Sequence, residues 1–409
     1  MAGRAASLRS PVSMAPAATL EVPVPATKVP TNEQVLEALD GVDDPELHRS
    51  IVELDMVGDV RISPRGVVEV EVALTIEGCP MRSEITNRVS TAVSALPGVR
   101  DVRVELGVMT DAQRAALRER LIGDPAATAG SGPAHGHAEG RAIPFADPAC
   151  RTRSLLVASG KGGVGKSSVT TNLAVALAAR GRSVAVVDAD VWGFSIPRML
   201  GIDRRPVVID EMLVPPEAHG VRCISMGFFA AEDQPVIWRG PMLHKALEQF
   251  LTDVWWDDPD YLLVDLPPGT GDISISLSQY LPRSEVYIVT TPQPAALSVA
   301  QRAGFMAKRV QLTTKGVIEN MSWFTGDDGK RYELFGSGGG AELARRLEVP
   351  LLGQVPLVTE LRAGGDSGRP VAALDPDGEA GRAFAAIAEA VDVELAPTRR
   401  YNPGLKLID

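Results

Sequence analysis

The sequence has little of what disulfide frameworks, membrane spans and nucleic-acid surfaces require. Its 409 residues contain three cysteines, Cys79, Cys150 and Cys223, too few and too scattered for a disulfide framework, which favours a reducing compartment. The longest uncharged run, Val286–Gln301, is interrupted by a glutamine and two prolines and falls short of the ~18 apolar residues of a membrane span. Lysine and arginine number 41 against 52 acidic residues, a net charge of −11, which argues against a broad nucleic-acid or lipid surface. We therefore expect a cytoplasmic protein that binds neither nucleic acid nor membrane.

Composition divides the chain into five segments. Residues 123–152 are rich in glycine, alanine, proline and histidine without periodicity, which is typical of a flexible linker. Prolines within residues 1–30 interrupt any apolar core of a secretory signal. We expect a disordered leader at 1–30, a small α+β domain at 31–122, a flexible linker at 123–152, a larger domain at 153–395 and a tail at 396–409. The tail is too short for an amphipathic membrane helix.

Apolar periodicity predicts secondary structure in both domains. In the small domain we expect helices at Asn32–Leu39, Glu84–Leu96 and Asp111–Leu121, with strands at Val67–Leu74 and Val99–Leu106. In the larger domain, short apolar runs alternate with helical stretches, the pattern of a mostly parallel sheet covered on both faces. Its predicted strands are Leu155–Ala158, Val184–Val187, Leu262–Val264, Val286–Val289 and Gly316–Ile318.

A phosphate-binding loop follows the first strand of the larger domain. Residues 160–167 read GKGGVGKS and match G-x-x-x-x-G-K-[ST], with a helix expected from about Lys166 to Arg180. Glycines let backbone N–H groups converge on phosphate, Lys166 reaches the β and γ phosphates, and Ser167 holds Mg²⁺. The residues expected to bind ATP here are Gly160, Lys161, Gly162, Gly163, Val164, Gly165, Lys166, Ser167 and Ser168.

Carboxylates follow two further strands, at the edge where open α/β sheets bind ligands. Asp188-Ala189-Asp190 follows the second strand, and Asp265 ends the third. Phosphoryl transfer needs a carboxylate near Mg²⁺ and a group that orients the attacking water, roles that we assign to Asp265 and Asp190. A solvated loop acid is the alternative for each. The predicted catalytic residues are Asp190, Lys161 and Lys166, and the predicted magnesium ligands are Ser167 and Asp265.

Lys161, directly after the first glycine, resembles the additional lysine of the deviant P-loop ATPases that include MinD, ParA and nitrogenase iron protein. In that group this lysine contacts nucleotide phosphate across a dimer interface. The resemblance therefore implies an α/β fold of the deviant Walker A P-loop type, with a mostly parallel sheet, and a homodimer. Without this resemblance, the sequence shows only that Lys161 places an additional positive charge near the phosphates.

Six separated blocks are similar to the Mrp/ApbC family of ATPases, which carry iron–sulfur clusters to apoproteins. The blocks are residues 188–193, 239–242, 265–272, 316–322, 335–340 and 364–368. The small domain, with Asp43-Asp44-Pro45-Glu46 and Gly78-Cys79-Pro80, resembles the SufT/MIP18-type domain linked to iron–sulfur assembly. The resemblance implies slow ATP hydrolysis and a contact between Asn320 and adenine, for which a buried amide bonded to the backbone is the alternative.

The chain departs from this family where many members place C-x-x-C, which lets a dimer bridge one cluster with four thiolates. Residues 323–330 read WFTGDDGK instead, and we expect an exposed turn at Asp327 and Asp328, whose oxygens suit a cluster poorly. Cys79 is the remaining candidate ligand, because a position at the N-terminus of the predicted helix Glu84–Leu96 would lower its thiol pKa. An inert buried cysteine is the alternative. One thiol cannot hold a cluster alone. Cys79 would therefore need further ligands from a second subunit, from another thiol or from the carboxylates of Asp43, Asp44 or Glu46.

Other cysteine, histidine and tryptophan residues have structural interpretations. We expect Cys223 in the core and Trp255-Trp256 in packing contacts. Cys150 closes the linker that contains His135 and His137, where a loose metal site is the weaker interpretation.

These features predict an ATP-binding and ATP-hydrolysing iron–sulfur cluster carrier. Its expected ligands are ATP, Mg²⁺ and an iron–sulfur cluster, its assembly a homodimer and its clients apoproteins or assembly proteins. An ATP-switched scaffold that holds no cluster is the second hypothesis, because the C-x-x-C pair is missing. A MinD/ParA-like positioning ATPase is the third, and it has the least support because the sequence has neither a basic stripe nor an amphipathic C-terminal helix.

Overall fold

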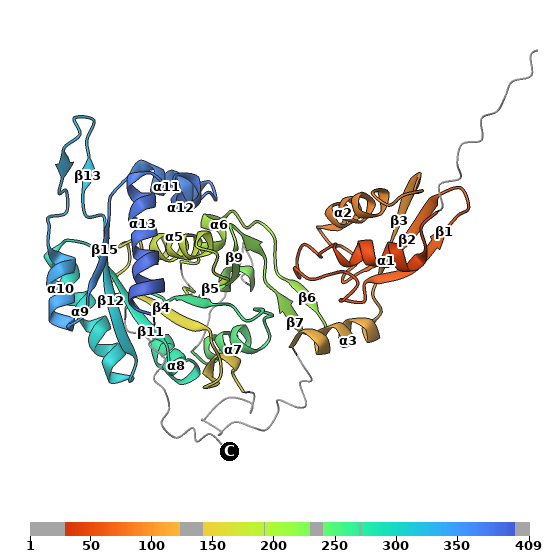
Figure 1. The fold of residues 1–409 in the computed structure, drawn as a ribbon. Helices are drawn as coiled ribbons and strands as arrows, with labels where there is room; N and C mark the ends of the chain where they lie inside the picture. Colours follow the sequence, from red (N-terminus) through yellow and green to blue (C-terminus); the bar gives the residue numbers. More distant parts are fainter. Residues whose placement is uncertain (1–28, 123–141, 192, 230–239, 270–271, 397–409) are drawn as a thin grey trace, which may run out of the picture.

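The computed structural model of this protein describes residues 29–122, 142–191, 193–229, 240–269 and 272–396. These residues form two bodies (Figure 1), which we call the small unit (29–122) and the large unit (142–396). Most of the expected leader, linker and tail, with His135 and His137, lies outside the described residues. In the part of the chain that is described, no helix is long and apolar enough to cross a membrane.

The small unit packs helices against one three-stranded sheet. The sheet has the order β1-β2-β3, with β1 antiparallel and β3 parallel to β2. Alternate residues of β2 are buried, as expected for a strand with one face on the core. The elements are α1 (Asn32–Asp40), β1 (Val57–Ile62), β2 (Val67–Leu74), α2 (Arg82–Ser94), β3 (Asp101–Val108) and α3 (Asp111–Ile122). The predicted elements are confirmed to within two residues, whereas β1 was not predicted, because an irregular register between Val57 and Val60 breaks its alternation.

The large unit is built on an eight-stranded sheet in the order β15-β12-β11-β4-β10-β5-β9-β8. All neighbours are parallel except β8, which is antiparallel to β9. The strands are β4 (Arg153–Ser159), β5 (Val184–Asp188), β8 (Glu217–Ala218), β9 (Val221–Ser225), β10 (Tyr261–Asp265), β11 (Glu285–Thr290), β12 (Thr313–Asn320) and β15 (Leu351–Val355). The five predicted strands are confirmed as parts of β4, β5, β10, β11 and β12.

Helices cover both faces of this sheet (Figure 1). On β4, Leu156 and Ala158 enter one core and Leu155 and Val157 the other, so the strand is apolar at consecutive positions. The first core includes residues of α7 (Gly240–Thr252), α8 (Asp272–Tyr280), α9 (Pro294–Arg309) and α10 (Gly339–Leu347). The second includes residues of α5 (Lys166–Ala179), α6 (Ile196–Leu200), α12 (Val371–Leu374) and α13 (Glu379–Glu389), while α11 (Thr359–Asp366) packs beside it.

A third apolar core joins the two units. The hairpin of β6 (Val207–Ile209) and β7 (Met212–Val214) extends from the large unit toward the small unit (Figure 1). Four hairpin residues and Trp255 are buried in one cluster with the core of the small unit. The hairpin residues are Val207, Ile209, Met212 and Val214. The two units are therefore in direct apolar contact.

Candidate functional site

The loop at residues 160–165 connects β4 to α5 at the carboxyl edge of the sheet. Gly163 and Gly165 both have φ of 78°, which side-chain-bearing residues rarely adopt. A Cβ atom on Gly165 would lie 2.2 Å from Asn320 Nδ2, and one on Gly160 would lie 2.3 Å from the carbonyl carbon of Val299. Backbone conformation and close neighbours therefore both require glycine in this loop.

Asp265, at the end of β10, accepts hydrogen bonds from three side chains of α5. It is fully buried. Its Oδ2 accepts from Lys166 Nζ and Ser167 Oγ, each at 2.6 Å, and its Oδ1 accepts from Thr170 Oγ1 at 2.6 Å. A buried carboxylate requires a compensating charge and hydrogen bonds, which Lys166 and two hydroxyl groups supply. The structure thus brings together the three residues that the sequence assigned to phosphate and Mg²⁺.

This donor set fits Mg²⁺ and nucleotide phosphate. Mg²⁺ takes oxygen ligands and keeps several of its waters, so Ser167 Oγ and Asp265 Oδ2, which are already in contact, are the residues that would hold it. Thr170 was not predicted. It lies one helical turn after Lys166 on α5, and its spacing is the signal that could have identified it.

Asp188, at the end of β5, is paired in register with Asp265 on the neighbouring strand. It is fully buried, and its Oδ2 accepts from Ser225 Oγ at 3.0 Å and from the backbone N–H of Ser195 and Ile196 at 3.1 and 3.3 Å. Burial, followed by the charge of Asp265, raises the pKa of Asp188 from 3.8 to about 7. These hydrogen bonds favour the ionised form, but desolvation outweighs them.

The raised pKa of Asp188 predicts how stability depends on pH. Between 3.8 and about 7 the folded state holds a proton that the unfolded state releases. The free energy of unfolding therefore falls as pH rises through this window, by up to about 1.4 kcal/mol per pH unit from this group. Asp188→Asn is expected to flatten that dependence in urea unfolding. Asp327→Asn, in an exposed turn, should retain the wild-type slope, and an unchanged slope in Asp188→Asn would contradict the assignment.

Asp190 lies two residues beyond β5 on the same edge of the sheet. It is 8% exposed, and its Oδ1 accepts the backbone N–H of Gly193 at 3.1 Å. A Cβ atom on Gly193 would lie 3.3 Å from Asp190 Oδ2. The carboxylate is therefore held within a tight turn that follows β5, and its catalytic role remains a prediction.

Lys161 contacts the residue that precedes α9. Its Nζ donates to Gln293 Oε1 at 3.2 Å, and Gln293 occupies the N-cap position of α9 without a side-chain capping hydrogen bond. The side chain thus contacts the loop after β11 within its own chain. Its contact with phosphate across a dimer interface remains a prediction.

Asn320, the last residue of β12, connects that strand to the phosphate loop. It is 1% exposed, and its Nδ2 donates to the carbonyl oxygen of Val164 at 2.9 Å. Its Oδ1 has no partner among the described residues, although buried polar atoms are normally hydrogen-bonded. One end of the amide therefore satisfies the backbone, the other end is unpaired among the described residues, and the contact with adenine remains a prediction.

Cys79 has a different environment from the one expected. Helix α2 begins at Arg82, and Cys79 is 4% exposed within the core of the small unit. Burial, supplemented by the charges of Glu46 and Asp44, raises the pKa of its thiol. The expected lowering by a helix dipole is wrong, because desolvation outweighs the backbone hydrogen bond from Met81. No group of three or more candidate ligands that could hold a metal is found within the described residues.

The segment that replaces C-x-x-C forms a hairpin of β13 (Phe324–Thr325) and β14 (Arg331–Tyr332), which projects from the large unit (Figure 1). Asp328 accepts the backbone N–H of Lys330 at 3.0 Å and the hydroxyl of Tyr332 at 2.9 Å. The prediction of an exposed turn is confirmed. Glu379 fixes the base of the hairpin by accepting from Trp323 Nε1 at 2.7 Å.

Packing roles are confirmed for Cys223 and for both tryptophans. Cys223 is fully buried in β9. Trp256 lies in one core of the large unit and donates its Nε1–H to the carbonyl of Phe250 at 2.8 Å. Trp255 lies in the core shared with the small unit. Cys150 is half-buried, and all three thiols are free.

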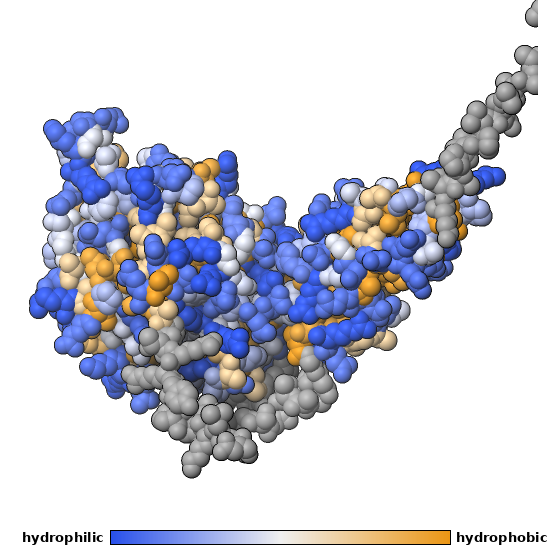
Figure 2. Space-filling view, in the orientation of Figure 1, coloured by the Kyte–Doolittle hydropathy of each residue, from blue (hydrophilic) through white to orange (hydrophobic). Residues whose placement is uncertain are grey.

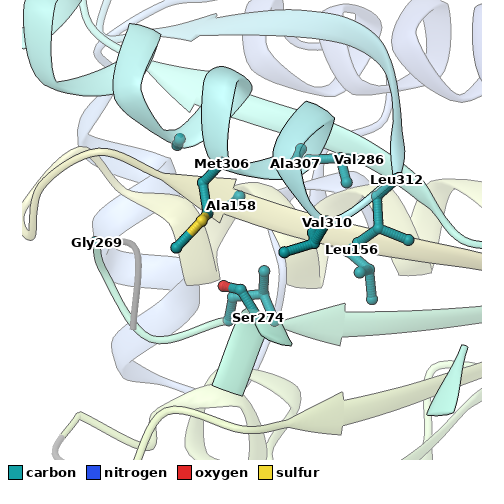
Figure 3. Close-up of a pocket in the computed structure, with 11 residues that line it drawn as sticks. Leu156, Ala158, Gly269, Ser274, Val286, Met306, Ala307, Val310 and Leu312 are labelled. Atoms are coloured by element: carbon teal, nitrogen blue, oxygen red, sulfur yellow. The ribbon is translucent and has the colours of Figure 1, made fainter. Parts of the chain in front are cut away.

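A small cavity lies beneath the loop that follows β10. Figure 3 shows Leu156 and Ala158 of β4, Met306 of α9 and Ser274 of α8 around it. Its volume is about 20 Å³, enough for about one water molecule. This cavity is too small for a ligand and is a packing feature of the first core.

A family model described as NUBPL iron-transfer P-loop NTPase matches residues 151–392, and one described as iron–sulfur cluster assembly protein matches residues 32–106. An iron–sulfur cluster carrier protein of Mycobacterium tuberculosis is 49% identical over 382 residues, covering 92% of this chain and 96% of that protein. A protein of the same name from Synechocystis is 40% identical, covering 88% and 97%. Among solved structures, a nucleotide-binding protein of Archaeoglobus fulgidus in complex with ADP is 34% identical, with a TM-score of 0.49, covering 57% of this chain and 91% of that one.

The parallel sheet, the glycine loop before α5 and the cluster around Asp265 define a nucleotide-binding P-loop NTPase. The chain belongs to the NUBPL iron-transfer P-loop NTPase family. The predicted fold class and the predicted resemblance are both confirmed.

Proposed function

We propose that this protein is an ATP-binding and ATP-hydrolysing iron–sulfur cluster carrier that acts as a cytoplasmic homodimer and delivers clusters to apoproteins. The observation that carries the ATPase part is the convergence of Lys166 and Ser167 on Asp265. Similarity to proteins named iron–sulfur cluster carriers, along 92% of the chain, supports the nature of the cargo. Three free thiols fit a reducing cytoplasm.

Each residue has a distinct role in the proposed reaction. Mg²⁺, when bound, neutralises charge on the phosphates. Ser167 and Asp265 would hold it, and Lys166 would leave Asp265 to contact the phosphate oxygens. Asp190 orients a water whose oxygen attacks the γ-phosphorus while the bond to the bridging β–γ oxygen breaks. ADP leaves with the bridging oxygen, and the protons of the water stay on the inorganic phosphate or pass to solvent. Asn320 Oδ1 accepts from the adenine amino group.

Hydrolysis would then act as a conformational switch. The loops after Asp190 and Asp265 are the segments that a γ-phosphate and Mg²⁺ would order and hydrolysis would release. In the carrier hypothesis, that change alters the affinity for cluster or client. In the scaffold hypothesis, which the missing C-x-x-C pair favours, it alters only the affinity for client proteins.

Anaerobic reconstitution with iron and sulfide distinguishes these hypotheses. We expect the wild-type protein to bind iron and acid-labile sulfide with visible absorbance, and Cys79→Ser to lose most of both if Cys79 is a ligand. Cys150→Ser, which alters a half-buried thiol at the edge of the first core of the large unit, is the matched control. Absence of a cluster in all three proteins would contradict the carrier and favour the scaffold, whereas equal loading would remove Cys79 from the site.

A further inference from the structure

Two hydrogen bonds fix Lys161 in the phosphate loop. Its carbonyl oxygen accepts from Ser159 Oγ at 3.1 Å, and its Nζ donates to Gln293 Oε1 at 3.2 Å. The two contacts come from neighbouring strands, because Ser159 ends β4 and Gln293 follows β11, which pairs with β4 in parallel. The ammonium group of Lys161 therefore has a defined position at the carboxyl edge of the sheet.

Gln293 lies in a segment whose backbone has little freedom. Prolines precede and follow it in the sequence, and its own φ of −60° and ψ of 132° are extended. A proline fixes its own φ and restricts the residue before it to extended conformations. The carbonyl oxygen of Pro292 is also in close contact with α10, since a Cβ atom on Gly339 would lie 2.3 Å from it. The amide that Lys161 contacts is therefore attached to a rigid part of the chain.

Helix α9, which begins directly after Gln293, packs against the start of the phosphate loop. A Cβ atom on Gly160 would lie 2.4 Å from the backbone nitrogen of Ala300. Gly160 thus contacts the backbone of α9, and Lys161 contacts the residue at its N-cap position. The side chain of Gln293 makes no capping hydrogen bond to the helix, so replacing it removes no hydrogen bond of α9.

The two lysines of the phosphate loop have chemically different partners. Lys166 Nζ contacts the carboxylate of Asp265 at 2.6 Å, whereas Lys161 Nζ contacts a neutral amide. An amide orients the ammonium group without neutralising its charge, so that charge remains available to stabilise negative charge on phosphate oxygens. A carboxylate at the same position would form an ion pair and compete with phosphate for the ammonium group.

We propose that Gln293 is a positioning residue for Lys161: its neutral amide orients the ammonium group and leaves the positive charge available to the γ-phosphate as the bond to ADP breaks. Lys161 is the residue that acts on the phosphate, and Gln293 acts through it. The proposal rests on the ATP hydrolysis of the proposed function. It holds whether Lys161 contacts the nucleotide of its own subunit or that of a second subunit.

Gln293→Met, which keeps the length of the side chain but removes the acceptor, is expected to lower kcat for ATP hydrolysis about fivefold with an unchanged KM. The same change in a Lys161→Ala background should produce no further loss, because the two residues act as one unit. Gln301→Met is the matched control, since Gln301 also lies on α9 and accepts from a cation, Arg346, at 3.2 Å. Wild-type kcat in Gln293→Met, or an equal loss in the Lys161→Ala background, would overturn the proposal.

Gln293→Glu tests the neutrality of the acceptor with almost no change of shape. Its carboxylate would pair with Lys161 and repel phosphate, so kcat is expected to fall about tenfold and to recover partly at high salt, which screens the charge. A kcat at or above that of the wild-type protein in Gln293→Glu would contradict the requirement for a neutral amide.

Chemical labelling of lysines tests the contact without ATP. With an amine-reactive ester and mass spectrometry, Lys161 is expected to react about threefold faster in Gln293→Met and more slowly in Gln293→Glu. Lys330 is the internal control, because its side chain is 77% exposed in the β13–β14 hairpin, whose surface is mostly hydrophilic in Figure 2. Unchanged labelling of Lys161 in both variants would overturn the positioning role. Altered labelling, together with no ATP hydrolysis by the wild-type protein, would contradict the proposed function while the contact between Lys161 and Gln293 stands.

Discussion

Lys166→Ala is expected to weaken ATP binding by about 100-fold. Lys166 is the positive group on α5 that reaches the β and γ phosphates, and charge-assisted bonds of this kind contribute about 1.5–3 kcal/mol each. About 3 kcal/mol corresponds to about a 100-fold change in Kd. Isothermal titration with ATP and Mg²⁺ measures the effect directly.

Two further variants distinguish a loss of ATP binding from a loss of the folded state. Removal of Lys166 leaves Asp265 with its hydroxyl donors but without the cation that contacts it at 2.6 Å, so Lys166→Gln, which retains a neutral donor, should fold better and still bind ATP weakly. Lys308→Ala, in the exposed last turn of α9, should bind as wild type does. Wild-type affinity in folded Lys166→Ala would contradict the assignment of the site.

The phosphate loop was predictable because its chemistry is local. A strand, a glycine-rich turn and a helix follow one another within about 25 residues, and the spacing of the glycines and Lys166 specifies the structure. Asp265 was predictable for a related reason: an acid that ends a buried parallel strand must lie at the carboxyl edge of the sheet. The structure places Lys166, Ser167 and Asp265 in direct contact.

Cys79 and Asp188 were not predictable in the same way, because burial depends on residues far away in sequence. A thiol before a helix has a lowered pKa only where solvent or donors stabilise the thiolate, and Cys79 is enclosed by its own core near Glu46. Asp188 was identified as part of a motif. Its raised pKa arises from enclosure at the centre of the sheet and from Asp265, 77 positions later in the chain.

The contact between the units was also beyond prediction from sequence. A linker rich in glycine and proline predicts that the two units move independently. The pairing of Glu46 with Arg204 and the shared burial of Trp255 depend instead on complementary surfaces of the two units. Glu46 and Arg204 lie 158 positions apart in the chain, so no local pattern in the sequence reveals their pairing.

Asp190→Asn is expected to lower the rate of ATP hydrolysis by about 100-fold while ATP affinity changes little. A positioned acid–base group typically contributes 100-fold or more to such a step, and Asp190 is held at the edge of the site by Gly193 N–H at 3.1 Å. Asparagine retains an oxygen for that bond but does not carry the negative charge that orients and polarises water. Phosphate release in single-turnover and steady-state assays measures the change.

Asp327→Asn is the matched control, since it makes the same chemical change in the exposed turn of the β13–β14 hairpin and should hydrolyse ATP at the wild-type rate. Asp188 is the competing candidate, because its pKa of about 7 would also suit proton transfer. Its carboxylate is, however, fully buried and bonded to Ser225 and to the N-terminus of α6, so Asp188→Asn should alter stability and its pH dependence more than the hydrolysis step. Hydrolysis at the wild-type rate in Asp190→Asn, together with a large loss in Asp188→Asn, would transfer the role from one aspartate to the other.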